Sequence, residues 1–277
     1  MTATVDLGGR AVIVTGGTRG LGKALGMEFS RAGAMVFLTH RWGSADEGEL
    51  RAEFASEGLS APHIIESDAS DPDAARSLMR EVAHHPSRLL AIISNVAFTG
   101  IVNDLRDLTR TSLELSLRYS TWPVLEYLHA AKETLGYHPS YALVISTDGA
   151  DVCHPGYDMA GVAKAALETL CRYLALRLRS AGVRVNVVRC GPLDTASSRA
   201  TFGDAVFDSD VVRREGLILD PRSVARACVA LCSGLMDSVT GQVITVDEGA
   251  SLLSPVVYLT QKGWPGPLPP TDTDVPL

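Results

Sequence analysis

A tyrosine and a lysine seven positions apart, Tyr157 and Lys164, are the side chains in this sequence best suited to proton chemistry. The residues around them have a helical pattern, and positions seven apart on a helix share one face, about 10 Å apart along the axis. A phenol has a reference pKa of about 10, and a nearby ammonium group lowers that pKa. We therefore expect the pair to face one cleft, with the lysine lowering the pKa of the tyrosine. The alternative is a core tyrosine beside a lysine whose methylene chain covers apolar surface.

A glycine-rich run follows the first apolar segment and leads into a helical pattern. Glycines permit a tight turn and let backbone N–H groups approach a pyrophosphate, and the start of a helix adds partial positive charge. A turn that binds no ligand can have the same composition, but the strand before this run and the helix after it strengthen the signal. We predict a dinucleotide-binding turn that contains Gly16, Thr18, Arg19, Gly20, Leu21 and Gly22.

The type of dinucleotide follows from charge. An NAD site normally has an acidic residue at the end of the second strand, where it binds the ribose 2′-hydroxyl. Here that strand ends in His40-Arg41 without an acid. Arg41 and Arg19 can make charge-assisted bonds to a 2′-phosphate, although either can equally be a solvated surface arginine. We predict NADPH as the cofactor, with Asp68 and Ala69 near its adenine; the alternative role of Asp68 is to cap the following helix.

Short apolar segments alternate with helical patterns along the chain. The predicted strands are Ala11–Thr15, Met35–Thr39, His63–Glu66, Leu89–Ser94, Tyr141–Ser146, Arg184–Val188 and Val243–Val246, and the predicted helices lie near 20–32, 46–57, 72–84, 111–135, 157–181 and 222–235. Several strands are apolar on both faces, which is typical of a parallel sheet. We predict α/β architecture over 1–250: a single-domain Rossmann-type, doubly wound parallel sheet of about seven strands with helices on both faces.

Two segments depart from this alternation. Residues 192–220 are polar and lack a clear period, and we predict a substrate flap over the carboxyl ends of the strands; an ordinary surface loop is the alternative. Residues 251–277 contain six prolines after Gly249, so we predict a proline-rich tail that is neither regular helix nor central strand.

Composition excludes several classes of protein. A net charge of −7 argues against nucleic acid as a partner. The five scattered cysteines fit a reducing compartment, and we predict no metal site. The N-terminal segment does not resemble a secretory signal, and no segment approaches the roughly 20 apolar residues of a membrane span. We therefore expect a soluble, cytoplasmic protein without a membrane partner.

The order and spacing of these motifs resemble the short-chain dehydrogenase/reductase family over roughly residues 8–250. The resemblance is carried by the Thr15–Gly22 turn, Asp68, Asn95 in Ser94-Asn95-Val96-Ala97, Ser146, Tyr157, Lys164 and Cys190-Gly191-Pro192-Leu193-Asp194-Thr195. Most members place the lysine four residues after the tyrosine, where this chain has Gly161. The Tyr-x6-Lys spacing, together with Phe98 after the fourth strand, is similar to the enoyl-acyl-carrier-protein reductase branch.

The resemblance implies an oxidoreductase and assigns roles to individual residues. Tyr157 would donate a hydrogen bond or proton to the substrate's carbonyl oxygen as hydride arrives from the nicotinamide, Lys164 would bind the ribose hydroxyls, and Ser146 would be a secondary polar contact. The expected cofactor contacts also include Asn95, Gly191, Pro192, Leu193 and Thr195. The expected substrate contacts are Phe98, Thr147, Asp148 and Tyr119.

The chain also departs from the family pattern. Many enoyl reductases have a second tyrosine ten residues before the first, where this chain has Thr147, and the fourth-strand motif keeps only Asn95. Asp148 and Asp151 suggest a more polar substrate. The first hypothesis is therefore reduction of an enoyl thioester or related conjugated carbonyl, small or carrier-bound. The alternatives are a ketoreductase of a specialised, polyketide-type metabolite and a non-catalytic NADP-binding sensor.

The segment 157–181 is apolar almost all round, so one sheet cannot cover all of its faces. A symmetric subunit contact would cover another face, and the resemblance implies a homodimer or homotetramer through this helix and the segment 111–135. A thick monomer core is the alternative.

Overall fold

The computed structural model describes residues 5–41, 46–98 and 100–254, and its centre is a sheet of seven parallel strands. The strands lie in the order β3-β2-β1-β4-β5-β6-β7. Their bounds are β1 Ala11–Val14, β2 Met35–His40, β3 His63–Glu66, β4 Leu89–Ser94, β5 Tyr141–Thr147, β6 Arg184–Cys190 and β7 Val243–Val246. This is the Rossmann-type doubly wound sheet that the sequence predicted.

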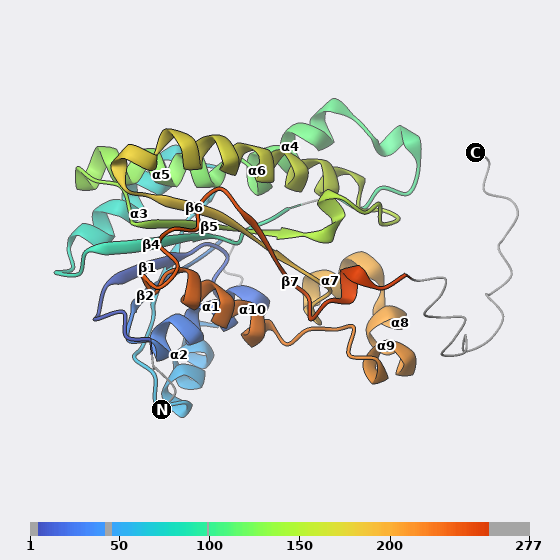
Figure 1. The fold of residues 1–277 in the computed structure, drawn as a ribbon, viewed down its shortest axis with the longest axis horizontal. Helices are drawn as coiled ribbons and strands as arrows, with labels where there is room; N and C mark the ends of the chain where they lie inside the picture. Colours follow the sequence, from blue (N-terminus) through green and yellow to red (C-terminus); the bar gives the residue numbers. More distant parts are fainter. Residues whose placement is uncertain (1–4, 42–45, 99, 255–277) are drawn as a thin grey trace, which may run out of the picture.

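Helices cover both faces of the sheet (Figure 1). One face carries α3 (Pro72–Ala83), α4 (Arg110–Ser120), α5 (Pro123–Leu135) and α6 (Asp158–Arg177). The other carries α1 (Gly20–Arg31), α2 (Glu47–Ser56) and α10 (Pro221–Leu231). Because each crossover helix returns the chain to the same edge, all seven strands end on one side of the sheet, and polar residues after different strands meet there.

The first strand shows how the sheet is buried from both sides. Val12 and Val14 pack in the hydrophobic cluster that contains α1 and α10. Ala11 and Ile13 pack in the cluster that contains α3 and α5. All four side chains are fully buried, so the continuous apolar segment reflects two packed faces rather than the alternation of a half-exposed strand.

The segment 111–135, predicted as one helix, is two helices. The chain turns at Thr121 and Trp122, and Pro123 occupies the first turn of α5, where its missing N–H leaves no helical bond unmade. The Thr121 hydroxyl donates a 2.7 Å hydrogen bond to the carbonyl of Ala163 on α6. The break lets α4 lie against α6 and α5 against α3.

The flap, residues 192–220, also has more regular structure than its sequence indicated. It contains three short helices, α7 (Ala196–Phe202), α8 (Asp204–Phe207) and α9 (Asp210–Arg214). Its two ends are joined, because Leu193 and Leu219 form a parallel bridge and the Leu219 N–H donates to the carbonyl of Pro192 at 2.9 Å. The flap is therefore a compact excursion closed at its base.

The flap lies beside the carboxyl ends of the strands, at the right of Figure 1. Most of the proline-rich tail lies outside the described residues. Across the described ranges, none of the helices combines the length and apolarity that crossing a bilayer requires.

Candidate active site

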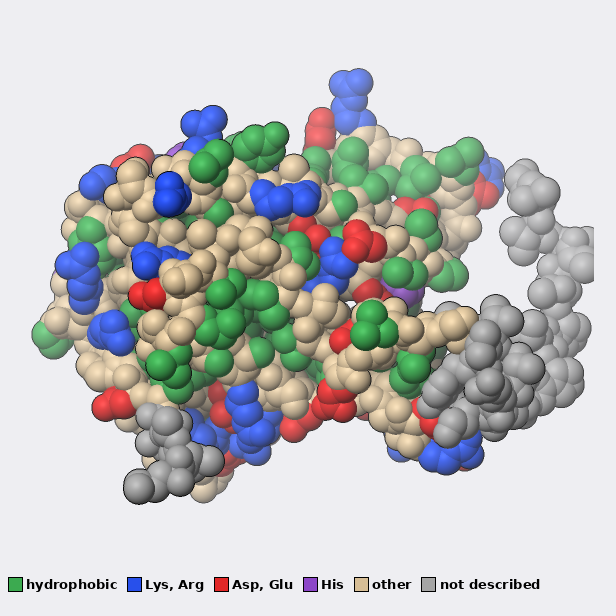
Figure 2. All heavy atoms as spheres, viewed as in Figure 1, with side chains coloured by type: hydrophobic (Ala, Val, Ile, Leu, Met, Phe, Trp, Pro, Cys, Tyr) green, Lys and Arg blue, Asp and Glu red, His purple; other side chains and the backbone are tan. Residues whose placement is uncertain are grey.

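A cavity of about 750 Å³, called the cleft below, runs along the carboxyl edge of the sheet. In Figure 2 a hollow separates the helix-covered sheet from the flap, and acidic and histidine side chains lie along it. Of the residues predicted for cofactor, catalysis and substrate, the cleft is lined by Gly16, Arg19, Gly20, Leu21, Gly22, Asn95, Thr147, Asp148, Tyr157, Lys164, Gly191, Pro192, Leu193 and Thr195. The glycine turn and the tyrosine–lysine pair therefore share one continuous space.

The glycine turn needs its glycines because the backbone folds back on itself. A Cβ atom added to Gly22 would lie 2.0 Å from the carbonyl oxygen of Gly16. Gly16 and Gly20 have φ of +61° and +52°, in the left-handed region that glycine adopts readily. A side chain at position 22 would force the turn open, so the sequence here is dictated by close backbone approach.

The start of α1 is open toward the cleft. Arg19 occupies the N-cap position without a side-chain cap, and the first turn of α1 contains no acidic residue. Helix N–H groups without partners, together with the positive end of the helix dipole, form an anion site. The bare backbone at Gly16 and Gly20 and this uncapped helix fit the pyrophosphate of a dinucleotide.

Asn95 fixes the turn to the fourth strand. Its side-chain amide donates to the carbonyls of Thr15 and Gly16 at 3.0 and 3.2 Å, and its backbone N–H donates to the Thr15 hydroxyl at 2.9 Å. Asn95 thus holds the end of β4 against the glycine turn as well as lining the cleft.

Arg41 and Asp68, predicted near the 2′-phosphate and the adenine, lie beyond the cleft lining and contact each other, whereas Arg19 lines the cleft. Arg41 forms a 2.9 Å ion pair with Asp68 and donates a hydrogen bond to the Tyr119 hydroxyl. Asp68 also accepts from the Ser70 backbone and hydroxyl. Thr18, His40 and Ala69 are buried beside these elements.

Two residues predicted on the substrate side lie with Arg41 instead. The Tyr119 ring lies under the Arg41 guanidinium, 5.5 Å from ring centroid to Cζ, and the Phe98 ring is 5.8 Å from that of Tyr119. Neither aromatic residue is among those that line the cleft. The structure thus places Phe98 and Tyr119 with Arg41, because Tyr119 near the end of α4 bonds to Arg41 and the next residue, Ser120, bonds to the backbone of Phe98.

Tyr157 ends the loop after β5 and occupies the N-cap position of α6. Burial raises its pKa above the usual value, and a hydrogen bond with Thr147 only partly offsets this. The predicted lowering of this pKa by Lys164 is therefore wrong: removing the phenol from water outweighs any attraction of the phenolate to an ammonium group. Tyr157 remains a protonated donor at neutral pH.

Lys164 lies on the same face of α6 as Tyr157, as the seven-residue spacing predicted. Both residues line the cleft. Its side chain is only 3% exposed, and its ammonium group donates to the carbonyl of Ile145 at 2.7 Å. Burial lowers its pKa to about 8, so the group is still mostly charged at pH 7.

Gly161 explains why the lysine is not four residues after the tyrosine. A Cβ atom at this position would lie 2.6 Å from the carbonyl oxygen of Gly149, in the short helix η2 (Asp148–Ala150) after β5. A lysine at 161 is therefore excluded by backbone contact. Lys164, one turn further along α6, lines the cleft together with Tyr157.

Ser146 faces away from the cleft. Its side chain is fully buried, and its hydroxyl donates to Glu168 on α6 at 2.6 Å. Glu168 also accepts two hydrogen bonds from Arg189, which pairs in turn with Asp151 in the loop before Tyr157. This network, buried except at Asp151, anchors the loop, so the geometry gives Ser146 a structural contact.

Comparison with known proteins agrees with this architecture. The family model described as "Enoyl-(Acyl carrier protein) reductase" matches residues 16–251. The chain belongs to the short-chain dehydrogenase/reductase family, with that reductase type as its match. It is accordingly an oxidoreductase of this family.

Individual relatives of this short-chain reductase are distant but nearly equal in length. Enoyl-[acyl-carrier-protein] reductase [NADH] FabI from Synechocystis is 26% identical over 90% of this chain and 99% of the relative. The 1-cyclohexenylcarbonyl-CoA reductase of Streptomyces collinus is 27% identical over 94% and 93%. Among solved structures, the Bacillus cereus enoyl-acyl carrier protein reductase with NADP⁺ and indole naphthyridinone superposes with a TM-score of 0.78 at 22% identity, covering 91% of this chain and 100% of that one.

The sequence motifs of the short-chain reductase missed one wall of its cleft. Phe202 on α7 packs against Tyr157 and His154, with ring centroids 5.4 and 5.7 Å apart, and Val206 and Phe207 line the same side. The only signal in the sequence was the presence of two phenylalanines, Phe202 and Phe207, within a polar segment. Because the segment has no clear helical period, the sequence did not show that they lie on one wall. The flap thus supplies an apolar wall next to Tyr157.

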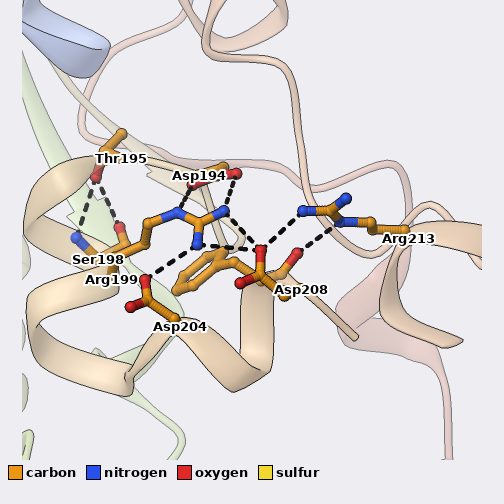
Figure 3. A network of polar contacts seen from close by, with 8 residues as sticks. Asp194, Thr195, Ser198, Arg199, Asp204, Asp208 and Arg213 are labelled. Atoms are coloured by element: carbon orange, nitrogen blue, oxygen red, sulfur yellow. Dashed lines mark hydrogen bonds and ion pairs between the residues drawn. The ribbon is translucent and has the colours of Figure 1, made fainter. Parts of the chain in front are cut away.

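A guanidinium group holds the flap of this reductase together. Arg199 makes two bonds to Asp194, at 2.6 and 2.8 Å, and also pairs with Asp204 and Asp208. Figure 3 shows it between these three carboxylates, with Arg213 bound to Asp208 from the far side. Because Asp194 immediately precedes Thr195 in the cleft lining, this network ties the base of the flap to its helices.

Proposed function

We propose that this short-chain reductase is an NADPH-dependent enzyme that reduces an enoyl thioester or a related conjugated carbonyl. The observation that carries the proposal is the single cleft that joins the glycine turn to Tyr157 and Lys164. The Tyr-x6-Lys spacing and the matched family model both favour the enoyl branch. We assign Tyr157 as the acid and Lys164 as the residue that holds the ribose.

Proton donation by Tyr157 fits its surroundings. A bound reduced nicotinamide supplies hydride to the substrate. Tyr157, whose pKa is raised by burial, donates its hydroxyl proton or a hydrogen bond to the carbonyl oxygen, where negative charge develops. Lys164, buried and mostly charged at neutral pH, lines the same cleft and would hold the ribose of the cofactor. The Phe202 ring packs against the Tyr157 ring, with centroids 5.4 Å apart, and would shield this oxygen from water.

Charge at the end of β2 supports NADPH over NADH. Arg41 lies at this strand end, paired with Asp68 at 2.9 Å, and Arg19 is exposed at the glycine turn. Two guanidinium groups suit a 2′-phosphate. The FabI relative is named for NADH and the Bacillus cereus structure contains NADP⁺, so relatives of both kinds exist.

We also propose that the substrate is a small molecule or is bound to a carrier, and that the enzyme is a homodimer or homotetramer. The support for assembly is α6, where Val162, Tyr173 and Leu176 are 52, 63 and 73% exposed in the single chain. Tyr173 and Leu176 are 11 and 14 residues after Val162, so all three lie on one face of the helix.

Spectrophotometry of NADPH oxidation tests the reaction. Purified wild type and Tyr157→Phe are assayed against a panel of enoyl thioesters and a panel of ketones. We expect turnover of enoyl thioesters, and loss of roughly 10²- to 10⁴-fold in the variant, because the proton donor is gone. Tyr137→Phe is the control, since its hydroxyl accepts from the Leu89 N–H at the opposite edge of the sheet. Turnover of ketones alone would replace the proposal with a ketoreductase, and NADPH binding without any turnover would indicate a sensor.

A further inference from the structure

The cleft contains a histidine–aspartate pair that the reaction above does not use. The Nε2 atom of His154 lies 3.1 Å from Oδ1 of Asp148, and both residues line the cleft. Their side chains are 28 and 34% exposed, so the pair is neither sealed in the core nor free on the surface. The motif analysis identified only Asp148.

The pair lies directly beside Tyr157. Asp148 is the first residue of η2 after β5, and the carbonyl of His154 accepts the backbone N–H of Tyr157 at 3.1 Å. The His154 and Tyr157 rings are 6.2 Å apart, centroid to centroid, nearly perpendicular. A substrate whose carbonyl oxygen contacts Tyr157 therefore extends past His154 within a few bonds.

Apolar side chains lie next to the pair. Phe202 packs against the His154 ring at 5.7 Å, and Pro155 and Val206 line the same part of the cleft. A simple hydrocarbon chain would need only such apolar walls, and polar groups covered by it would lose their bonds to water. The position of the pair therefore favours a substrate that supplies a polar partner.

The hydrogen-bonding capacity left on the pair defines that partner. Nε2 of His154 faces Oδ1 of Asp148 at 3.1 Å, which leaves Nδ1 of the ring and the second carboxylate oxygen as the remaining polar atoms of the pair. Within the described ranges, no residue bonds to Nδ1 or to the second oxygen of Asp148. A hydroxyl group both donates and accepts hydrogen bonds, so it can bond to either of these atoms.

We propose that His154, positioned by Asp148, binds a hydroxyl group of the substrate a few bonds from the carbonyl that Tyr157 contacts. This proposal deepens the proposed function and rests on it. The substrate is then a hydroxylated enoyl thioester or related conjugated carbonyl, rather than a plain acyl chain. The pair selects substrate, and Tyr157 remains the proton donor.

Two thioesters of equal length test the selection: the N-acetylcysteamine thioesters of trans-2-hexenoate and of 4-hydroxy-trans-2-hexenoate. We expect wild type to prefer the hydroxylated compound in kcat/KM. His154→Leu and Asp148→Asn should reduce that preference by about tenfold or more, because the hydroxyl loses its partner. His154→Gln, which keeps an acceptor, should retain part of it. Cys153→Ala is the control, since this side chain is exposed and is not among those that line the cleft.

The outcomes separate this proposal from the reductase itself. An unchanged preference in both variants, or an equal loss on both thioesters, would show that the pair is only structural. Calorimetry with Tyr157→Phe and NADP⁺ measures binding of each thioester without chemistry, with and without His154→Leu. If the hydroxylated thioester binds more tightly, His154→Leu abolishes that preference, and wild type turns over neither thioester, the proposed role of the pair stands and the proposed reductase activity is rejected. Turnover of both thioesters with no preference in rate or binding would retain the reductase and reject the pair.

Discussion

At the scale of single residues, the chemistry depends on two buried groups with opposite responses to burial. Removal from water favours the neutral form of each, so it raises the pKa of Tyr157 and lowers the pKa of Lys164 to about 8. The spacing of the two residues predicted their shared cleft. The direction in which the pKa of Tyr157 shifts depends on how deeply Gly149 and the flap enclose its ring. The spacing of residues in the sequence carries no information about that enclosure.

The pKa of Lys164 predicts an alkaline limit to activity. Below pH 8 the ammonium group is charged, and above it the charge is lost, while Tyr157 stays protonated because its pKa is raised. We expect kcat/KM to be level from pH 6 to 7.5 and to fall about tenfold per unit well above pH 8. The pH–rate profile of Lys164→Arg checks this, because a guanidinium keeps its charge: the same decline in that variant would mean that another group titrates.

Arg41 predicts the choice of cofactor. Arg41→Ala removes a charged donor and leaves Asp68 unpaired where the phosphate is expected. We expect NADPH to bind about ten- to hundredfold more weakly, and NADH to change much less. Fluorescence titration with both nucleotides measures this. Arg80→Ala, on the outer surface of α3, is the matched control; equal losses for NADPH and NADH would remove the argument from phosphate binding.

At the scale of elements, the flap joins cofactor and substrate sides of the cleft. Its base is a parallel bridge, its α7 helix begins at Thr195, and its Phe202 covers Tyr157. The sequence indicated a flap from length and polarity, yet the charged residues that gave this polarity largely neutralise one another around Arg199. A polar segment thus contains short helices that are stabilised by ion pairs.

Removing the centre of this network should loosen the flap. For Arg199→Gln we expect kcat/KM to fall about tenfold, since misplacing the wall beside Tyr157 disturbs substrate alignment. Chymotrypsin should cleave near Phe202 and Phe207 sooner than in wild type. Arg76→Gln breaks an exposed pair with Asp73 on α3 and is the control. Unaltered cleavage and kinetics in Arg199→Gln would show that the flap holds without the network.

At the scale of the whole molecule, the sheet brings the ends of β1, β4, β5 and β6 to one edge, while α6 presents apolar residues to solvent. Tyr173 and Leu176 are the most exposed of them in the single chain. Leu167 and Cys171 of the same helix are only 1% exposed and pack in the cluster that contains β5, β6 and α5, so α6 has one internal and one external apolar face. The external face is what a subunit contact would bury.

Charge on that face should dissociate the assembly. We expect Tyr173→Glu combined with Leu176→Lys to reduce the molar mass in solution from a dimer or tetramer toward 29.4 kDa, because association would then bury charged groups. Sedimentation velocity measures this. Leu105→Lys is the control, because Leu105 is 81% exposed and lies on another segment. If the wild-type protein sediments as a monomer, the prediction that this face forms a subunit contact is wrong.

Local patterns in the sequence determined the seven strands, the glycine turn, and the seven-residue spacing of Tyr157 and Lys164. These features depend on backbone geometry and on period, which neighbouring residues encode. The tertiary structure alone decided that Ser146 faces Glu168, that Tyr119 lies with Arg41, and that His154 pairs with Asp148 beside Tyr157. Those outcomes depend on the rotation of each strand and on which distant helix packs against it. The local sequence permits several side-chain directions, and tertiary packing selects one of them.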